Sequence, residues 1–198
     1  MMIRHLIAAV SLAAALTGCA SPQSRFYGLD ATAAAPAPAQ FGKRVLLGPI
    51  SLPAALERPQ LVLDIGGGQL KLQEFDRWSA PLDRLMAQRL SLGVARASGV
   101  ASVYAYPQPG MDGGELRVAV DVRSLSLRPG QGAALEAAWQ LQSAVDGRIL
   151  ARGAFSRSQP VASSEPGALV AGLQTLLDGL AADIAAPLIQ HPEWWRAG

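Results

Sequence analysis

The sequence predicts an α+β fold in which a mixed or antiparallel β-sheet with a C-terminal meander carries two α-helices packed on one face. Residues 82–94 and 169–188 place apolar side chains at three- and four-residue spacings, which is typical of a helix with one buried side. Residues 116–127 and 135–141 alternate apolar and polar side chains, which is typical of strands with one buried face.

Residues 1–18 have the three parts of an export signal. Arg4 supplies a positive start, residues 6–16 form an apolar run of 11 residues, and small residues lead to Cys19. A transmembrane helix needs about 20 apolar residues, so this run is too short to span a bilayer. An ordinary secretory signal with an incidental cysteine is the alternative interpretation. However, Cys19 is the only cysteine in the chain, so it has no partner for an intramolecular disulfide.

The segment Leu16-Thr17-Gly18-Cys19 resembles the lipobox that lipoprotein signal peptidase recognises. We therefore expect Cys19 to be the lipidated first residue of the mature chain, attached to a membrane by its acyl chains. The next residues, Ala20 and Ser21, are not the aspartate that retains lipoproteins at the inner membrane, so the periplasmic face of the outer membrane is the expected location. Residues 19–40 are rich in alanine and proline and are predicted to form a flexible tether.

The folded domain is predicted over residues 41–190. A turn at Gly66-Gly67-Gly68 makes the second and third strands a hairpin. A helix is expected from Pro81 to near Gly99, with Arg89 among the polar residues that face away from the core. The predicted strands of this half cover residues 43–50, 60–65, 69–75 and 100–106.

The second half is predicted to be a three-stranded meander over residues 115–157, followed by a helix that starts at Pro166. The apolar positions change from even to odd numbers after Val122, which indicates a β-bulge near Arg123-Ser124. Pro187 is expected to end or kink the last helix. In the aromatic tail, residues 191–198, the pair Trp194-Trp195 has three open roles: to cap the core, to join a partner, or to sit at a membrane interface.

Composition argues against several functions. The formal net charge falls from +2 to +1 when residues 1–18 are removed, and no Lys/Arg run forms a basic patch, so nucleic-acid binding is not expected. His5 leaves with the signal, which places the other histidine, His191, in the tail. The chain therefore offers no Ser/His/Asp set or His/Cys zinc site, and we predict no metal, no cofactor and no enzymatic activity.

A series of motifs is more specific than any of these features. It begins in the tether with an aromatic pair and a small residue, Phe26-Tyr27-Gly28-Leu29. It continues with Gly48-Pro49-Ile50-Ser51-Leu52-Pro53, then Leu56-Glu57-Arg58-Pro59-Gln60-Leu61-Val62, then Asp76-Arg77-Trp78-Ser79-Ala80-Pro81-Leu82, and a tryptophan, Trp139, in the meander. The series resembles the ABC-type transport auxiliary lipoproteins, the family of paraquat-inducible protein C (PqiC/YmbA-like). The chain departs from that pattern at Leu63-Asp64-Ile65, before the three glycines.

The resemblance implies an outer-membrane-anchored periplasmic subunit of an MCE-type system that moves lipids between two membranes. Its partners would be an MCE-domain protein and inner-membrane transport components, and it is also expected to form a homo-oligomeric ring. A structural lipoprotein that assists assembly of another envelope or secretion complex is the alternative function.

Five residues are predicted to have a partner-binding or structural role: Arg58, Asp76, Arg77, Trp78 and Trp139. Asp76 is expected to cap the first helix, with Trp78 packed beneath it. Both Trp78 and Trp139 are interpreted as core residues rather than ligand platforms. Arg58 is expected to bridge to Glu57, Asp64 or the region of Asp76.

Overall fold

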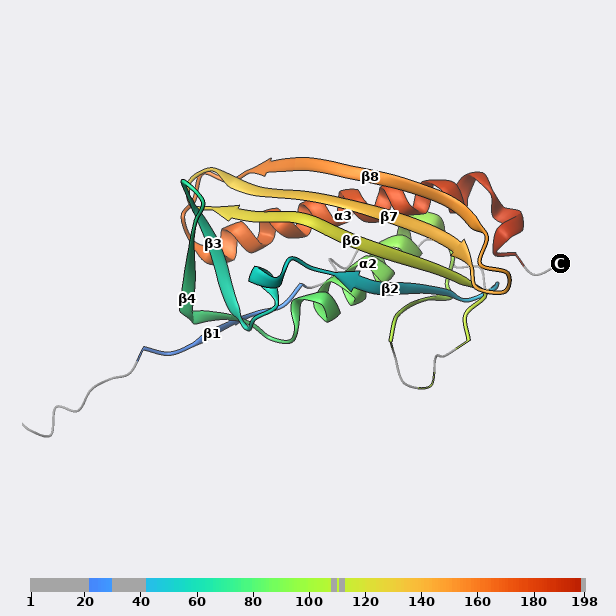
Figure 1. Ribbon diagram of the computed structural model, residues 1–198, viewed down its shortest axis with the longest axis horizontal. Coiled ribbons are helices and arrows are strands. Elements are labelled where there is room, and N and C mark those ends of the chain that lie inside the picture. Colours follow the sequence, from blue (N-terminus) through green and yellow to red (C-terminus); the bar gives the residue numbers. More distant parts are fainter. Residues whose placement is uncertain (1–21, 30–41, 108–109, 111–112, 197–198) are drawn as a thin grey trace, which may run out of the picture.

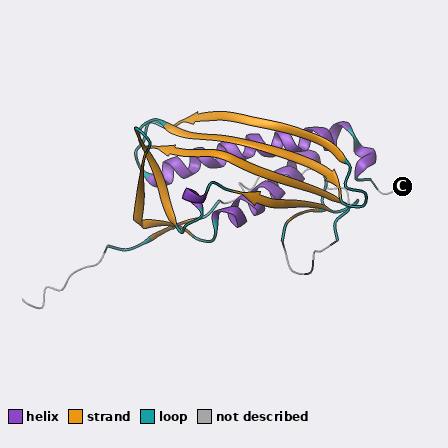
Figure 2. Ribbon diagram, viewed as in Figure 1, coloured by secondary structure: helices purple, strands orange, loops and turns teal. Residues whose placement is uncertain are grey.

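A five-stranded sheet forms one layer of the molecule, and two long helices cover one of its faces (Figures 1 and 2). The computed structural model describes residues 22–29, 42–107, 110 and 113–196. Residues 1–18 and Cys19, predicted to be a signal peptide and a lipid anchor, lie outside this part of the chain. The elements of the large sheet layer are β2 (Val45–Ser51), β5 (Val103–Ala105), β6 (Leu116–Arg128), β7 (Gly132–Ser143), β8 (Ile149–Pro160), α2 (Leu82–Ser98) and α3 (Pro166–Gln190).

The strand order β5-β2-β6-β7-β8 contains the predicted meander at its end. Strand β2 is parallel to β5 and β6, whereas β6, β7 and β8 are antiparallel to one another. The register between β6 and β7 shifts between Val122 and Ser124, so the predicted bulge is confirmed. Because the bulge adds one residue, Leu127 joins Val122 in the buried core although their sequence numbers differ in parity.

Helix α2 begins and ends where the sequence signals lie. Pro81 precedes its first residue and needs no hydrogen-bond acceptor there, and Gly99 closes it with a φ of 74° in the left-handed region. Arg89 was expected to face away from the core, and this prediction is wrong. Its side chain is 1% exposed and donates from Nη2 to both carboxylate oxygens of Asp178 on α3, each at 2.7 Å.

Helix α3 supplies much of the core. Leu169, Leu173, Leu177 and Leu180 are fully buried beneath the sheet. By length and composition α3 would suffice to cross a membrane, but its apolar side chains pack inside the domain. The helix continues through Pro187 to Gln190, so this proline does not end it.

The tail after α3 closes one end of the core. A short 3-10 helix, η2 (Pro192–Trp194), brings Trp195 back under the domain, where it is 4% exposed. The Trp195 indole donates to the carbonyl oxygen of Leu188 at 2.9 Å. The capping role, one of the three alternatives, is therefore the one that Trp195 takes. Trp194 packs partly against the core and stacks on His191 with ring centroids 4.2 Å apart.

The predicted hairpin is present, but it belongs to a second, three-stranded sheet at one end of the molecule (Figure 1). Strand β3 (Gln60–Gly66) pairs antiparallel with β4 (Gln69–Trp78), and β4 pairs parallel with β1 (Arg25–Tyr27). The predicted flexible tether over residues 19–40 needs correction, because strand β1 lies within it. Residues 25–27 form a strand and Leu29 is 6% exposed, so the ordered fold starts well inside that range; residues 30–41 lie outside the described part.

Candidate functional site

A hollow of about 530 Å³ lies where the small sheet meets the start of α2. This volume is within the range of small-ligand and side-chain binding pockets. Its buried floor consists of Ile50, Trp78 and Leu82. Its exposed rim and walls come from Leu52, Glu57, Arg58, Pro59, Ser79, Ala80, Pro81 and Asp83. The three separate motifs of the sequence therefore meet around one hollow.

Backbone hydrogen bonds position the two sides of this hollow. The Trp78 N–H donates to the carbonyl oxygen of Pro59 at 2.7 Å, which joins the end of β4 to the segment before β3. That segment contains the 3-10 helix η1 (Ala54–Leu56), between Pro53 and Pro59. Because each proline fixes its own φ, this connection has few alternative conformations. The hollow is therefore a feature of the backbone and not of a few side-chain rotamers.

Arg58 stands on the exposed rim. None of its predicted bridges forms: among the described residues, its side chain makes no ion pair or hydrogen bond. Asp64 pairs instead with Arg128, whose Nε and Nη2 both lie 2.8 Å from Oδ2. The backbone N–H of Gly66, and then Arg128, lower the pKa of Asp64 below its usual value. The guanidinium of Arg58 is thus left facing solvent beside the hollow.

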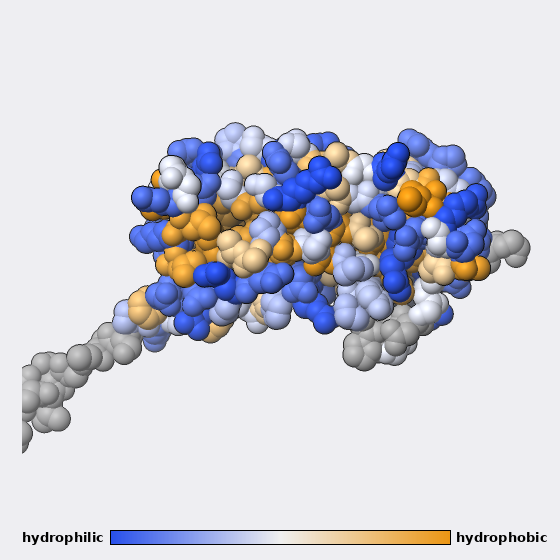
Figure 3. Space-filling view, viewed as in Figure 1, coloured by the Kyte–Doolittle hydropathy of each residue, from blue (hydrophilic) through white to orange (hydrophobic). Residues whose placement is uncertain are grey.

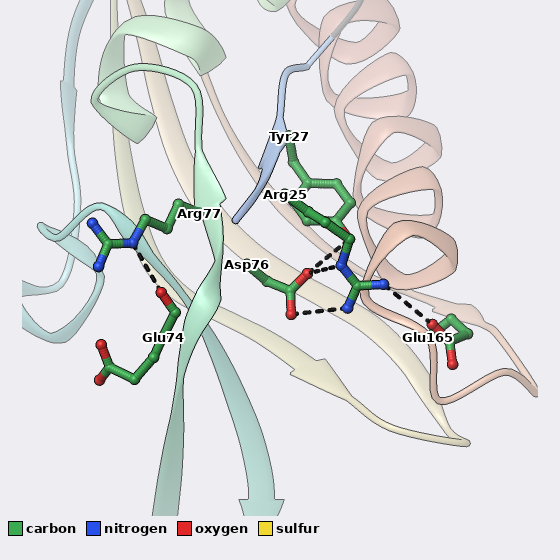
Figure 4. A network of polar contacts seen from close by, with 6 residues as sticks. All are labelled: Arg25, Tyr27, Glu74, Asp76, Arg77 and Glu165. Atoms are coloured by element: carbon green, nitrogen blue, oxygen red, sulfur yellow. Dashed lines mark hydrogen bonds and ion pairs between the residues drawn. The ribbon is translucent and has the colours of Figure 1, made fainter. Parts of the chain in front are cut away.

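Asp76 is placed differently from the prediction. It lies within β4 and not at the helix start, and α2 has no side-chain cap. Its carboxylate is buried and accepts three bonds from β1: Arg25 Nε at 2.7 Å, Arg25 Nη2 at 3.1 Å and the Tyr27 hydroxyl at 2.9 Å (Figure 4). Burial, and then the bond to Asp76, raise the pKa of Tyr27. Asp76 therefore holds the N-terminal strand on the sheet.

Arg77 points to the other side of β4 (Figure 4). Its Nε donates to the carbonyl oxygen of Glu74 at 2.9 Å, and the rest of the guanidinium lies toward solvent. Side chains of successive strand residues point to opposite faces. The adjacent Asp76 and Arg77 therefore serve different surfaces, one internal and one external.

The two tryptophans are both core residues, as predicted, with exposed fractions of 5% for Trp78 and 8% for Trp139. They do not share a site. Trp139 lies on β7 opposite Val120 and Gly153, and a Cβ at Gly153 would stand 2.6 Å from the Trp139 ring. Trp139 therefore requires a glycine on the neighbouring strand and has a packing role, whereas Trp78 also forms the floor of the hollow.

The sequence did not predict that Arg25 and Tyr27 complete the Asp76 network, although Phe26-Tyr27 belongs to the series of motifs. The aromatic pair Phe26-Tyr27 was the available signal, since two aromatic residues beside an arginine are unusual in an Ala/Pro tether. Glu165, before α3, adds a longer contact of 3.9 Å to Arg25 (Figure 4). The hollow itself combines an apolar floor with charged groups on its rim. Such a surface can bind an apolar group that a partner carries among polar ones.

The sequence profile of the family described as ABC-type transport auxiliary lipoprotein component matches residues 27–185. The chain belongs to this family. No curated protein is a significant match.

Two crystal structures share the fold. One is of an uncharacterized protein, 17% identical, with a TM-score of 0.65 over 84% of this chain and 99% of that one. The other is of a protein from Xanthomonas campestris assigned to the family DUF330, 18% identical, with a TM-score of 0.63 over 87% of this chain and 95% of that one.

Proposed function

We propose that the protein is a lipoprotein subunit of an MCE-type intermembrane lipid transport system, anchored through Cys19 to the periplasmic face of the outer membrane. It acts without catalysis, by docking the end of a tunnel formed by an MCE-domain protein. Inner-membrane transport components complete the system, and several copies of the chain surround the tunnel end as a ring.

Membership of the auxiliary lipoprotein family over residues 27–185 carries this proposal. The structure supports a docking role at the hollow. Arg58 and Trp78 are 20 positions apart in the sequence, yet the bond between Trp78 and Pro59 brings them to the same surface. A buried apolar floor, beside a cation that has no partner among the described residues, resembles the centre and rim of a protein–protein interface.

The test is capture of the MCE-domain protein by the full lipidated chain, purified from membranes. Arg58→Glu is expected to weaken capture about tenfold or more, because it places a negative charge where the partner meets a positive one. Arg148→Glu is the matched control, since Arg148 is also exposed and belongs to the distant β7–β8 loop. Unfolding should be unchanged in both variants, because neither side chain supports the core.

Equal capture by the two variants would exclude the hollow as the docking site. Failure of the unaltered chain to capture the MCE-domain protein would refute the transport function. If the chain then co-purified with a different envelope complex, the alternative function in assembly would be favoured. Native mass spectrometry separates the two functions further, since bound lipid beyond the covalent anchor is expected only for a transport component.

A further inference from the structure

The small sheet has an outward face that no part of the described structure covers. Strand register assigns its members, because paired residues project to the same side of a sheet. Val62 pairs with Leu72, and Phe26 pairs with Arg77 in the same sheet. Alternation adds Leu70 beside Leu72 and Phe75 beside Arg77. Gln60 pairs with Arg77, and the register shift between Gln60 and Leu61 brings both parts of β4 to this same side. We call Phe26, Leu70, Leu72 and Phe75 the apolar face.

These four side chains are unusually exposed for their type, at 66%, 52%, 37% and 46% respectively. Beneath them Val62 is 6% exposed, yet it does not belong to the main core. The apolar face is therefore a contiguous cluster that shields its own central residue. Figure 3 shows hydrophobic side chains reaching the surface at the end of the molecule occupied by β3 and β4. Contiguous exposed apolar surface of this kind marks a contact with a protein or a membrane.

The position of the anchor decides between these occupants. Arg25 follows Cys19 by six positions, and an extended chain of that length reaches about 20 Å at most. Strand β1 is itself part of the small sheet, and its Phe26 belongs to the apolar face. A lipid on Cys19 would thus hold this end of the domain, and not the far end, near the bilayer surface.

Charges at this end are compatible with the same occupant. Asp64, which lies on the same side of β3 as Val62, is paired with Arg128. On β4, Arg77 lies on the side of the apolar face, Lys71 projects to the opposite side, and Glu74 is an exposed acid. Basic residues beside an apolar surface are typical of proteins that lie on membranes.

We propose that the apolar face rests in the headgroup region of the membrane that holds the lipid of Cys19, as a second and non-covalent membrane contact. The proposal rests on the proposed function, because it requires the anchor. It orients the domain, so that the long strands and α3 extend away from the bilayer. Two aromatic rings, Phe26 and Phe75, and two leucines are suited to this region, where apolar side chains insert shallowly.

Site-directed spin labelling tests the orientation in the full chain. Cys19 is the only natural cysteine, so lipidation leaves an introduced cysteine as the single reactive thiol. Leu72→Cys reports on the apolar face. Val145→Cys is the control, because Val145 is 83% exposed in the loop between β7 and β8, away from the small sheet. Each lipidated variant is labelled and reconstituted in vesicles of phosphatidylethanolamine and phosphatidylglycerol.

Relative to the label at position 145, the label at position 72 is expected to collide more often with oxygen and less often with a water-soluble nickel complex, by about threefold or more. The label at position 145 should show the collision rates of a side chain that is fully exposed to water. Equal accessibility at the two positions would overturn the proposal. Spin–spin broadening at position 72 would also overturn it, since this result assigns the face to a second copy of the chain.

Mass spectrometry of the N-terminal peptide distinguishes failure of the membrane contact from failure of the proposed function. Lipid on Cys19 without insertion of residue 72 refutes the membrane contact alone and leaves the transport function standing. An unmodified Cys19 refutes the anchor and, with it, both proposals. Insertion of residue 72 in a chain that fails to capture the MCE-domain protein supports the contact and refutes the transport function.

Discussion

Replacement of Asp76 by alanine should loosen strand β1 from the rest of the domain. Asp76 is 4% exposed, and its carboxylate accepts a bond from the Tyr27 hydroxyl at 2.9 Å as well as two from Arg25. Arg25 is 57% exposed, so water and salt screen its ion pair and we attribute no stability to it. The bond from Tyr27 to a charged acceptor contributes about 1.5 kcal/mol. Asp76→Ala should therefore lower the free energy of unfolding by about 1.5 kcal/mol.

Urea denaturation measures this loss of stability. A double-mutant cycle determines how much of it comes from the bond between Tyr27 and Asp76. Tyr27→Phe removes only the hydroxyl, so its coupling energy with Asp76→Ala should be about 1 kcal/mol. The coupling should persist at high salt, since the bond is shielded from solvent, whereas any coupling with Arg25→Ala should disappear. Hydrogen exchange measures the loosening of β1 directly. The Ser79 N–H, which donates to the carbonyl oxygen of Tyr27 at 2.9 Å, should exchange faster in Asp76→Ala. A coupling near zero, with Ser79 still protected, would refute the role assigned to Asp76.

Three further outcomes follow from single contacts. Gly153→Ala should cost about 1–3 kcal/mol in urea denaturation, because the new Cβ would meet the Trp139 ring at 2.6 Å. The control Ala154→Val, on the exposed side of β8, should change stability by less than about 0.5 kcal/mol; similar losses in both would disprove the steric cause. Asp64→Asn should destabilise by about 1 kcal/mol at pH 7. Because folding lowers the pKa of Asp64 from 3.8, its contribution is present above that pH and is lost as the pH falls through the folded-state value, so denaturation curves of the two proteins should converge in acid. Cys19→Ser should leave the melting temperature unchanged and move the protein from the membrane to the soluble fraction; retention in the membrane fraction would contradict lipid anchoring at this residue.

Local patterns predicted the regular elements well. The change of parity after Val122 located the bulge, and Pro81 with Gly99 located the ends of α2, because these signals depend on a few neighbouring residues. Strand β1 escaped prediction because three residues carry too little periodicity to distinguish a strand from a linker. Its partner strand lies 51 positions away, and only tertiary structure brings the two together.

The site was predicted in its parts but not in its arrangement. The motif residues Arg58 and Trp78 do meet, but neither sequence spacing nor composition reveals a hollow between them. Asp76 seemed suited to cap a helix because it precedes one by six residues. The β-structure of residues 76–78 overrode that local preference, since pairing with β1 satisfies both the backbone and the carboxylate.

The order of elements along the chain has a consequence for biogenesis. Helix α3 is apolar enough in length and composition to partition into a bilayer if it met one while uncovered. The meander β6–β8 that covers it is complete before the first residue of α3. In a chain that crosses a membrane with its N-terminus first, the sheet therefore emerges ahead of the helix, and a folding surface is available to α3 when it arrives. A circular permutant that placed α3 before β6 would lose this protection, and we expect such a chain to be retained in the membrane during export.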